Sequence, residues 1–155
     1  MINLSLSVMM VMTPTLGTED VNEIASIVAG ETIPGVDQAH MWVACTILDD
    51  LERGYTVAGL HPGRWNGHRP PAETHIAAVQ RSLNAGCTHV PECRFLGSGK
   101  DHDRHWSHLP NRVHRIRSGQ WEMVCVEREN TTRITTRRRE SRHWPQWKLD
   151  ALKYP

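Results

Sequence analysis

Glu31 is the residue whose type and position best suit proton transfer. It follows Gly30 at the expected end of an amphipathic helix, and a turn at Pro34 and Gly35 comes shortly after it. A carboxylate in this place faces the negative end of the helix dipole and receives few hydrogen bonds from backbone N–H groups, so its charged form is disfavoured. We therefore expect a side chain suited to donating a proton. Taken alone, the position also fits a solvated residue after a helix end.

The ten histidines raise the question of a metal site. Imidazole and thiolate groups are good zinc ligands. The densest group of such residues comprises His102, Asp103, His105 and His108, with His89 and Cys93 upstream. This group begins in a glycine-rich segment and lacks the helical HExxH arrangement of zinc hydrolases. A polar surface loop is the favoured interpretation, and the sequence predicts neither a metal nor another cofactor.

Three helices are expected to position Glu31 and its surroundings. Apolar periodicity, capping residues and closing glycines place them at about residues 18–30, 37–53 and 70–86. The second has the pattern of a core helix. A glycine-punctuated segment, 57–69, lies between the second and third helices and contains Trp65 and several histidines. We expect it to be a loop that lines a site.

A small sheet is expected after the helices. Residues 113–127 alternate around Ser118 and Gly119, which indicates a hairpin with Trp121, Met123 and Cys125 on one face. Residues 87–99 are interpreted as a loop with a short apolar piece. The sequence therefore predicts an α+β fold, with a helical core and a small antiparallel β-sheet.

The four cysteines leave the redox state open. They do not form the CxxC pairs of a zinc ribbon. Cys87 and Cys93 bracket a short loop and fit either a disulfide or two free thiols. Cys45 and Cys125 lie in apolar patterns, so we expect each to be a small buried hydrophobic residue.

Length and charge indicate one compact domain with an apolar N-terminal end and a basic C-terminal end. The chain has 155 residues, 39% of them hydrophobic, and a net charge of +1. We expect an apolar N-terminal arm over 1–16, a main domain over 17–129 and a basic C-terminal extension over 130–155. The arm lacks the Lys or Arg of a secretory leader and is too short to cross a bilayer. We expect it to dock on the core or on a partner, without stable membrane insertion.

The basic C-terminal extension admits two interpretations. Arg137 to Arg139, with Trp144 and Trp147 nearby, could hold phosphates and stack bases, as in a nucleic-acid-binding protein. A flexible basic segment that holds an anionic cell wall, or anchors the protein in an assembly, is the favoured alternative.

Three blocks, taken in order, resemble the spore-cortex-lytic (SleB-like) cell-wall hydrolases. They are IASIVAGETIPGVDQAHMWVACTILDDL from residue 24, TVAGLHPGRWNGHRPP from residue 56 with the helix that comes after it, and CRFLGSGKDHDRHW from residue 93. The resemblance covers roughly residues 18–106. It implies a lysozyme-like domain that cleaves the glycan strands of peptidoglycan. The family's asparagine-arginine pair at the end of the second helix is replaced here by Asp49 and Asp50.

By this resemblance, Glu31 is the general acid that protonates the bridging oxygen between N-acetylmuramic acid and N-acetylglucosamine. In a lytic transglycosylase the muramoyl hydroxyl then attacks and Glu31 returns as the base, giving a 1,6-anhydro product. This one-carboxylate mechanism is favoured. Plain muramidase hydrolysis, with a helper such as Asp37, is the alternative. The sequence does not place the candidates for a second carboxylate, which are Asp37, Asp49, Asp50, Glu73, Asp101 and Asp103.

A glycan cleft needs aromatic platforms with polar groups beside them. Trp65, between Arg64 and Asn66, fits this need best, with Phe95 and Trp106 as second choices. Gly97 would allow the backbone to approach a sugar, and Thr32 is the further candidate beside the acid. Core packing is the competing interpretation of each tryptophan, and it is favoured for Trp42 and Trp121.

The expected partner is therefore the peptidoglycan glycan strand, and the expected place of action is the bacterial cell wall. The small size suggests a phage-type endolysin or a virion-associated lysin, which could attach to a phage particle through either end of the chain. A catalytically inactive protein that keeps the fold as a structural or virion component is the other alternative, beside nucleic-acid binding.

Overall fold

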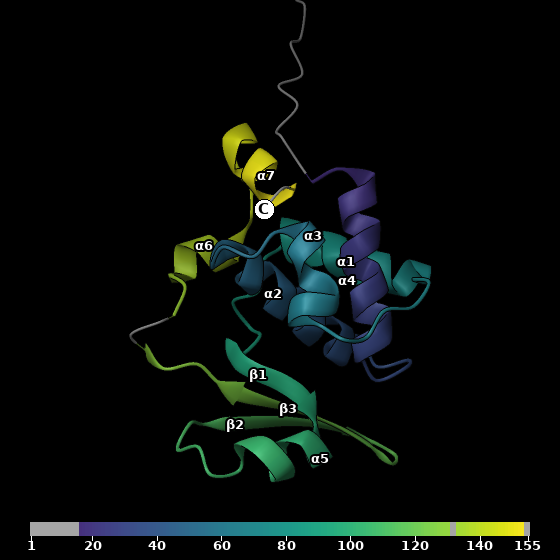
Figure 1. The fold of residues 1–155 in the computed structure, drawn as a ribbon, viewed down its shortest axis with the longest axis vertical. Coiled ribbons are helices and arrows are strands. Elements are labelled where there is room, and N and C mark those ends of the chain that lie inside the picture. Colours follow the sequence, from purple (N-terminus) through teal and green to yellow (C-terminus); the bar gives the residue numbers. More distant parts are fainter. Residues whose placement is uncertain (1–15, 131–132, 154–155) are drawn as a thin grey trace, which may run out of the picture.

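The computed structural model describes residues 16–130 and 133–153, which fold as an α+β protein with a helical core and a three-stranded antiparallel sheet (Figure 1). The fold class predicted from the sequence is confirmed. The larger helices are α1 (Thr18–Glu31), α2 (Asp37–Glu52), α4 (Glu73–Asn84) and α7 (Gln146–Lys153). Shorter turns are α3 (Val57–Gly59), η1 (Leu60–Arg64), α5 (Gly99–Asp101), η2 (His102–Trp106) and α6 (Thr136–Glu140). The strands are β1 (Cys93–Ser98), β2 (Val113–Ser118) and β3 (Trp121–Glu127).

Helix α1 forms where its apolar stripe predicts a helix. Val21, Ile24 and Val28 are buried, and the acidic Glu19 and Asp20 occupy the first turn, where the helix dipole favours negative charge. The helix continues one residue past the predicted end at Gly30. Glu31 is therefore its last helical residue.

Helix α2 is the core helix that the sequence predicts. Every residue from Ala39 to Leu51 is buried, so α2 is enclosed over three turns by the other elements. Even the two adjacent acids near its end, Asp49 and Asp50, are 0% and 2% exposed. Because buried carboxylates need charged or hydrogen-bonding partners, these two acids fix the positions of the segments that supply those partners.

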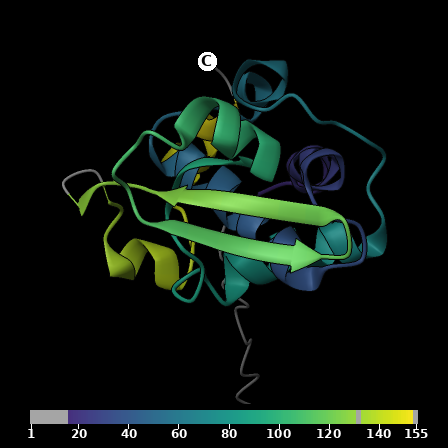
Figure 2. The same cartoon turned by 90° about the horizontal axis from the view of Figure 1, so that it is seen from below.

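The sheet lies on one side of the helices, in the order β1-β3-β2. The predicted hairpin is β2 and β3, which lie side by side in front of the helices in Figure 2. Met123 and Cys125 are buried as expected, but Trp121 is 54% exposed, so its assignment to the core is wrong. The loop predicted over 87–99 is also wrong in part, because β1 pairs with β3 there.

Two disulfides join elements that are distant in the sequence. Cys45 on α2 bonds Cys87 after α4, and Cys93 on β1 bonds Cys125 on β3. The Cys87–Cys93 bridge and the pair of free thiols that the sequence left open are therefore both wrong, whereas Cys45 and Cys125 are buried in the core as expected. Disulfides persist in oxidising compartments and are rare in the cytosol of most organisms. The pairing thus favours folding outside a reducing cytosol.

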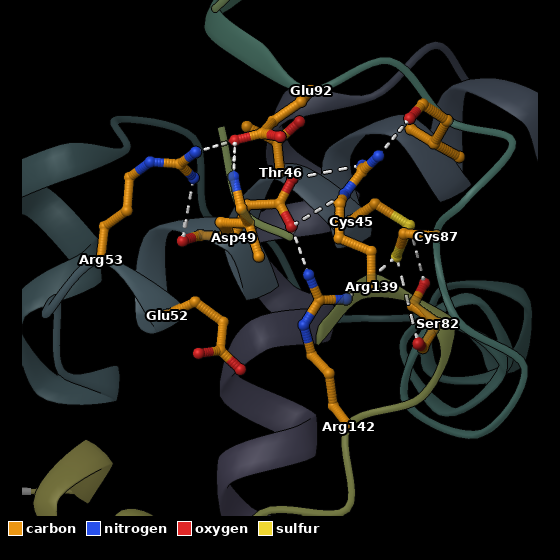
Figure 3. A network of polar contacts seen from close by, with 12 residues as sticks. Cys45, Thr46, Asp49, Glu52, Arg53, Ser82, Cys87, Glu92, Arg139 and Arg142 are labelled. Atoms are coloured by element: carbon orange, nitrogen blue, oxygen red, sulfur yellow. Dashed lines mark hydrogen bonds and ion pairs between the residues drawn. A yellow bond between two sulfur atoms is a disulfide. The ribbon is translucent and has the colours of Figure 1, made fainter. Parts of the chain in front are cut away.

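The C-terminal segment packs against the helical core. Arg139 and Arg142 reach Asp49 from this segment and form buried ion pairs with it (Figure 3). The indole N–H of Trp144 donates to Glu52, and Leu149 and Leu152 of α7 belong to the main core. Residues 133–153 therefore do not form the flexible extension that the sequence predicts from residue 130. They lie against the core, because two of their arginines compensate a buried charge.

The N-terminal arm falls mostly outside the described residues. Leu16 is described, and it is buried in the core, whereas residues 1–15 are not described. Among the helices that the structure describes, none has the length and apolar character to span a bilayer.

Replacing Asp49 by Asn should lower the free energy of unfolding by about 3–5 kcal/mol, because the buried Arg139 and Arg142 would lose the carboxylate with which both pair. Glu19→Gln, on the exposed start of α1, should cost less than about 1 kcal/mol. Urea unfolding of both variants measures the difference. An equal, small loss in both would contradict an anchoring role for Asp49.

The paired histidines His40 and His75 should make the fold sensitive to acid. Their rings lie 4.8 Å apart, and burial lowers the pKa of both, with the neighbouring charge of His75 also lowering that of His40. The unfolded chain then takes up protons first as the pH falls below the ordinary value of 6.5, so stability is full above that pH and declines below it.

The free energy of unfolding should therefore decline over the acidic range below pH 6.5, and His40→Gln should flatten that dependence. The exposed His108, replaced by Gln, is the matched control and should leave the slope as it is in the parent protein. Urea titrations across this range test both. The same slope in all three proteins would exclude His40 as a contributor.

Candidate functional site

Glu31 lies at the C-terminal end of α1, where its side chain is half-buried. Its Oε1 atom accepts hydrogen bonds from the backbone N–H groups of Asn66, at 3.0 Å, and Gly67. The expectation of a carboxylate with little help from amides is therefore wrong, because the donors come from a loop 35 residues later. Within the part of the chain that the structure describes, Oε2 has no hydrogen-bond partner. One oxygen is fixed, and the other is unengaged among the described residues of this half-buried side chain.

A close contact between two glycines holds the loop against α1. A Cβ atom at Gly30 would lie 2.2 Å from the backbone nitrogen of His68, and one at Gly67 would lie 2.6 Å from the carbonyl of Gly30. The same Cβ at Gly67 would lie 2.9 Å from the carboxyl carbon of Glu31. Both positions require glycine on steric grounds, and the contact brings the two amides within reach of the carboxylate.

Residues 66–69, which we term the strap, run back along α1 from Glu31. The backbone N–H of Arg69 donates to the carbonyl of Ser26 at 3.0 Å. The ring of His68 lies 3.2 Å from the carboxylate of Glu23. The strap is therefore attached to α1 over more than one turn, and Glu31 accepts from its first two amides.

The residues before the strap are anchored to α2. Asp50 accepts hydrogen bonds from the indole N–H of Trp65 and from Nε of Arg64, both at 3.0 Å. Burial raises the pKa of the Asp50 carboxyl above its ordinary value, while the charge and hydrogen bond of Arg64 act in the opposite direction. Trp65 is only 5% exposed. Its assignment as an open platform for sugars is therefore wrong, because its ring and its N–H are both used internally.

Arg64 and Asn66 also have structural contacts. The guanidinium of Arg64 donates to the carbonyl of Arg94 on β1 as well as to Asp50, so it joins the loop to the sheet. Asn66 contributes its backbone amide to Glu31, and its side chain is exposed. Thr32 caps α1, and its hydroxyl oxygen is buried without a hydrogen bond among the described residues. Substrate contacts by these residues stay predictions.

Phe95, Gly97 and Trp106, three candidates for substrate contacts, lie together at the sheet. The rings of Phe95 and Trp106 stack with their centroids 5.2 Å apart, and the guanidinium of Arg94 lies 5.0 Å from the centroid of the Phe95 ring. A Cβ at Gly97 would lie 2.8 Å from the Trp106 ring. Gly97 thus makes room for an indole, and both stacked rings are half-buried.

The candidates for a second carboxylate differ in how they are engaged. Asp49 and Asp50 are buried, the first with two arginines of the C-terminal segment and the second with the loop before the strap. Asp101 accepts from the hydroxyl and the amide of Ser98, and these bonds lower its pKa. Asp37 stands at the start of α2 with its side chain 81% exposed. Asp37 is thus open to a solvent-borne ligand, and so are the two remaining candidates, the exposed Glu73 and Asp103, whose side chain is 79% exposed.

The histidine-rich segment has local contacts of its own. His102 is buried beside Asp103, at 3.3 Å, and beside Arg115, at 3.4 Å. Cys93 is held in a disulfide and supplies no thiolate. In the described ranges, no three His, Cys, Asp or Glu side chains lie close enough to hold a metal ion.

A polar cavity of about 540 Å³, which the sequence did not reveal, lies between α2, the segment before β1 and the ends of β2 and β3. His114 and Glu127 face each other in its wall, with Nε2 and Oε2 2.7 Å apart, and Arg133 pairs with the same Glu127. Trp42 packs edge-on against His114 and is 5% exposed, as its core interpretation predicts. No motif signals this cavity, because its residues come from five separate segments, the C-terminal segment among them.

Comparisons with protein-family models, with curated proteins and with solved structures find no match for this chain. Its function must therefore be argued from the residues and their geometry.

Gly67→Ala should displace the strap and lower the free energy of unfolding by about 1–3 kcal/mol, because the added methyl group would overlap the backbone of Gly30. Gly63→Ala is the matched control in the same loop, since a Cβ there meets nothing within 4 Å. It should change stability by less than about 1 kcal/mol. Urea unfolding, with hydrogen exchange of the Asn66 and Gly67 amides, measures both effects. Equal protection of these amides in the two variants would contradict the close contact.

Proposed function

We propose that this protein cleaves the glycan strands of peptidoglycan, with Glu31 as the residue that transfers protons. The observation that carries the proposal is the asymmetry of the Glu31 carboxyl group. Two backbone amides fix Oε1, while Oε2 is unengaged among the described residues. A proton donor must be oriented and accessible at once, and this arrangement meets both requirements.

The chemistry follows from the two oxygens. A proton on Oε2 passes to the bridging oxygen as the bond to C1 of the muramoyl residue breaks, and the leaving sugar departs as an alcohol. Glu31 is left as a carboxylate, and the amides of Asn66 and Gly67 stabilise its negative charge. The carboxylate can then accept a proton from the group that attacks C1. One carboxyl group thus serves as acid and then as base.

The placement of the other acids favours attack by the muramoyl hydroxyl, as in a lytic transglycosylase. A hydrolase of the common kind needs a second carboxylate beside the scissile bond. Asp49 and Asp50 are buried and paired, and Asp101 is bonded to Ser98. Plain hydrolysis would have to use one of the exposed candidates, Asp37, Glu73 or Asp103. The anchoring contact of Asp37 among the described residues is a distant one, to His40 at 3.9 Å.

Two further features support a cell-wall substrate. The stacked rings of Phe95 and Trp106 offer an aromatic surface beside a guanidinium, which suits the flat apolar faces of sugars. The two disulfides suit a protein that works outside a reducing cytosol. An endolysin or a virion-associated lysin of phage type, acting at the bacterial wall, fits both.

A structural role for Glu31 is the second candidate. Its hydrogen bonds to the strap would also hold the loop in a protein without activity, such as a structural component of a particle. Nucleic-acid binding by the C-terminal segment has less support, because Arg139 and Trp144 are buried and engaged.

Glu31→Gln should lower the rate of peptidoglycan cleavage by about 10²–10⁴-fold, because the amide oxygen can still accept from the strap but the side chain has no proton to transfer. Turbidity of purified peptidoglycan gives the rate. Mass spectrometry of the released fragments identifies the product, and a 1,6-anhydro end is expected. Asp37→Asn should keep the parent rate and product.

Two outcomes would contradict this proposal in different ways. Equal clearing by the parent protein and Glu31→Gln would remove Glu31 from the reaction. If the parent protein releases fragments with reducing sugar ends and Asp37→Asn does not, the mechanism is hydrolysis that uses two carboxylates and not transglycosylation. An inactive parent protein whose Glu31→Gln variant loses stability would support the structural role.

A further inference from the structure

Asp50 reaches the Glu31 site only through other residues. It lies near the end of α2 and accepts from the side chains of Arg64 and Trp65. The next two residues along the chain are Asn66 and Gly67, whose amides donate to Glu31. A continuous path of contacts therefore runs from a buried acid on the core helix to the open acid at the end of α1.

The first part of this path is rigid. Asp50 is 2% exposed and Trp65 is 5% exposed, so neither group can exchange its partner for water. The backbone N–H of Trp65 also donates to the carbonyl of Leu60 at 2.7 Å, which closes the η1 turn before it. A side chain fixed at both its ring and its backbone sets the direction in which the next amides point.

The neighbouring acid, Asp49, serves a different segment. It binds Arg139 and Arg142 from the C-terminal segment, and these contacts do not involve the strap. Two adjacent carboxylates on α2 thus hold two separate parts of the chain. This division makes the effect of Asp50 on Glu31 distinguishable from a general loss of buried charge.

We propose that Asp50 is a positioning residue for Glu31: by holding Trp65 and Arg64, it orients the amides that fix the Glu31 carboxylate. The inference rests on the proposed function for its effect on catalysis, whereas the positioning itself is a property of the folded protein. Removing the Asp50 carboxyl group should release the start of the strap and let Glu31 turn away from its productive orientation.

The test compares graded changes along the path with a matched change elsewhere. Asp50→Ala removes Oδ2, the oxygen that accepts from both Arg64 and Trp65, while Asp50→Asn keeps an oxygen that can accept from Trp65. Trp65→Phe removes the indole N–H. Trp144→Phe is the control, because Trp144 is also a buried indole that donates its N–H to a carboxylate on α2, namely Glu52, but it lies in the C-terminal segment.

Two readouts separate positioning from catalysis. Nitrogen-15 NMR follows the amide of Gly67 while the carboxyl groups are titrated, and in the parent protein its shift should follow the protonation of Glu31. The response should be lost in Asp50→Ala, weakened in Asp50→Asn and Trp65→Phe, and kept in Trp144→Phe. In peptidoglycan cleavage, kcat should fall by about 100-fold in Asp50→Ala, with a smaller fall in Asp50→Asn, because a displacement of about 1 Å is enough for a loss of that size.

The outcomes decide each proposal separately. A folded Asp50→Ala or Trp65→Phe protein whose Gly67 amide still responds as in the parent overturns the positioning role, whatever the activity. If Asp50→Ala does not fold, the Asp50→Asn and Trp65→Phe proteins decide the same question. If the Gly67 response depends on Asp50 but the parent protein has no cleavage activity, the positioning role is supported and the proposed function is rejected. Equal losses in Trp65→Phe and Trp144→Phe reject positioning in favour of general destabilisation.

Discussion

The burial of two adjacent carboxylates on α2 is the constraint on which the rest of the structure depends. A carboxylate removed from water costs several kcal/mol unless charged or hydrogen-bonding partners surround it. Successive helix residues point about 100° apart, so Asp49 and Asp50 face different surroundings. Asp49 forms ion pairs with Arg139 and Arg142 (Figure 3), and Asp50 accepts hydrogen bonds from Arg64 and Trp65. Both sets of partners come from short helical turns and the loops beside them, so α2 helps to determine where those segments lie.

The candidate site follows from the second of these anchors. After the fixed Trp65 the chain passes close to the end of α1, and the Gly30–Gly67 contact allows that approach. Glu31 then receives amide donors that its own helix end does not supply. The site is thus assembled from one helix end and one loop, each held by the core, rather than from a single local motif.

Local patterns predict the parts of this arrangement that depend on neighbours in the sequence. The stripe of α1, the burial of α2 and the β2–β3 hairpin follow from periodicity and turn residues, and the predicted end of α1 lies within one residue of Glu31. The partners of Glu31 are not predictable, because its donors are backbone groups of residues 66 and 67, and any sequence has such groups. The disulfide partners escape prediction because Cys45 and Cys87 are 42 residues apart. The burial of the C-terminal segment is not predictable for a related reason, since Arg142 pairs with an acid 93 positions earlier in the sequence.

The same reasoning separates the acids of the site by what they can do. The carboxylates of Asp49 and Asp50 are held in place but cannot be reached by a substrate, because they are paired with buried donors and less than 3% of each residue is exposed. Asp37 has access without orientation, since 81% of its side chain is exposed. Glu31 combines the two, with Oε1 held by amides and Oε2 unengaged among the described residues. Proton transfer needs a group that is held in place on one side and reachable on the other. A mechanism that relies on this single carboxyl group is therefore the one that the distribution of buried and open acids favours.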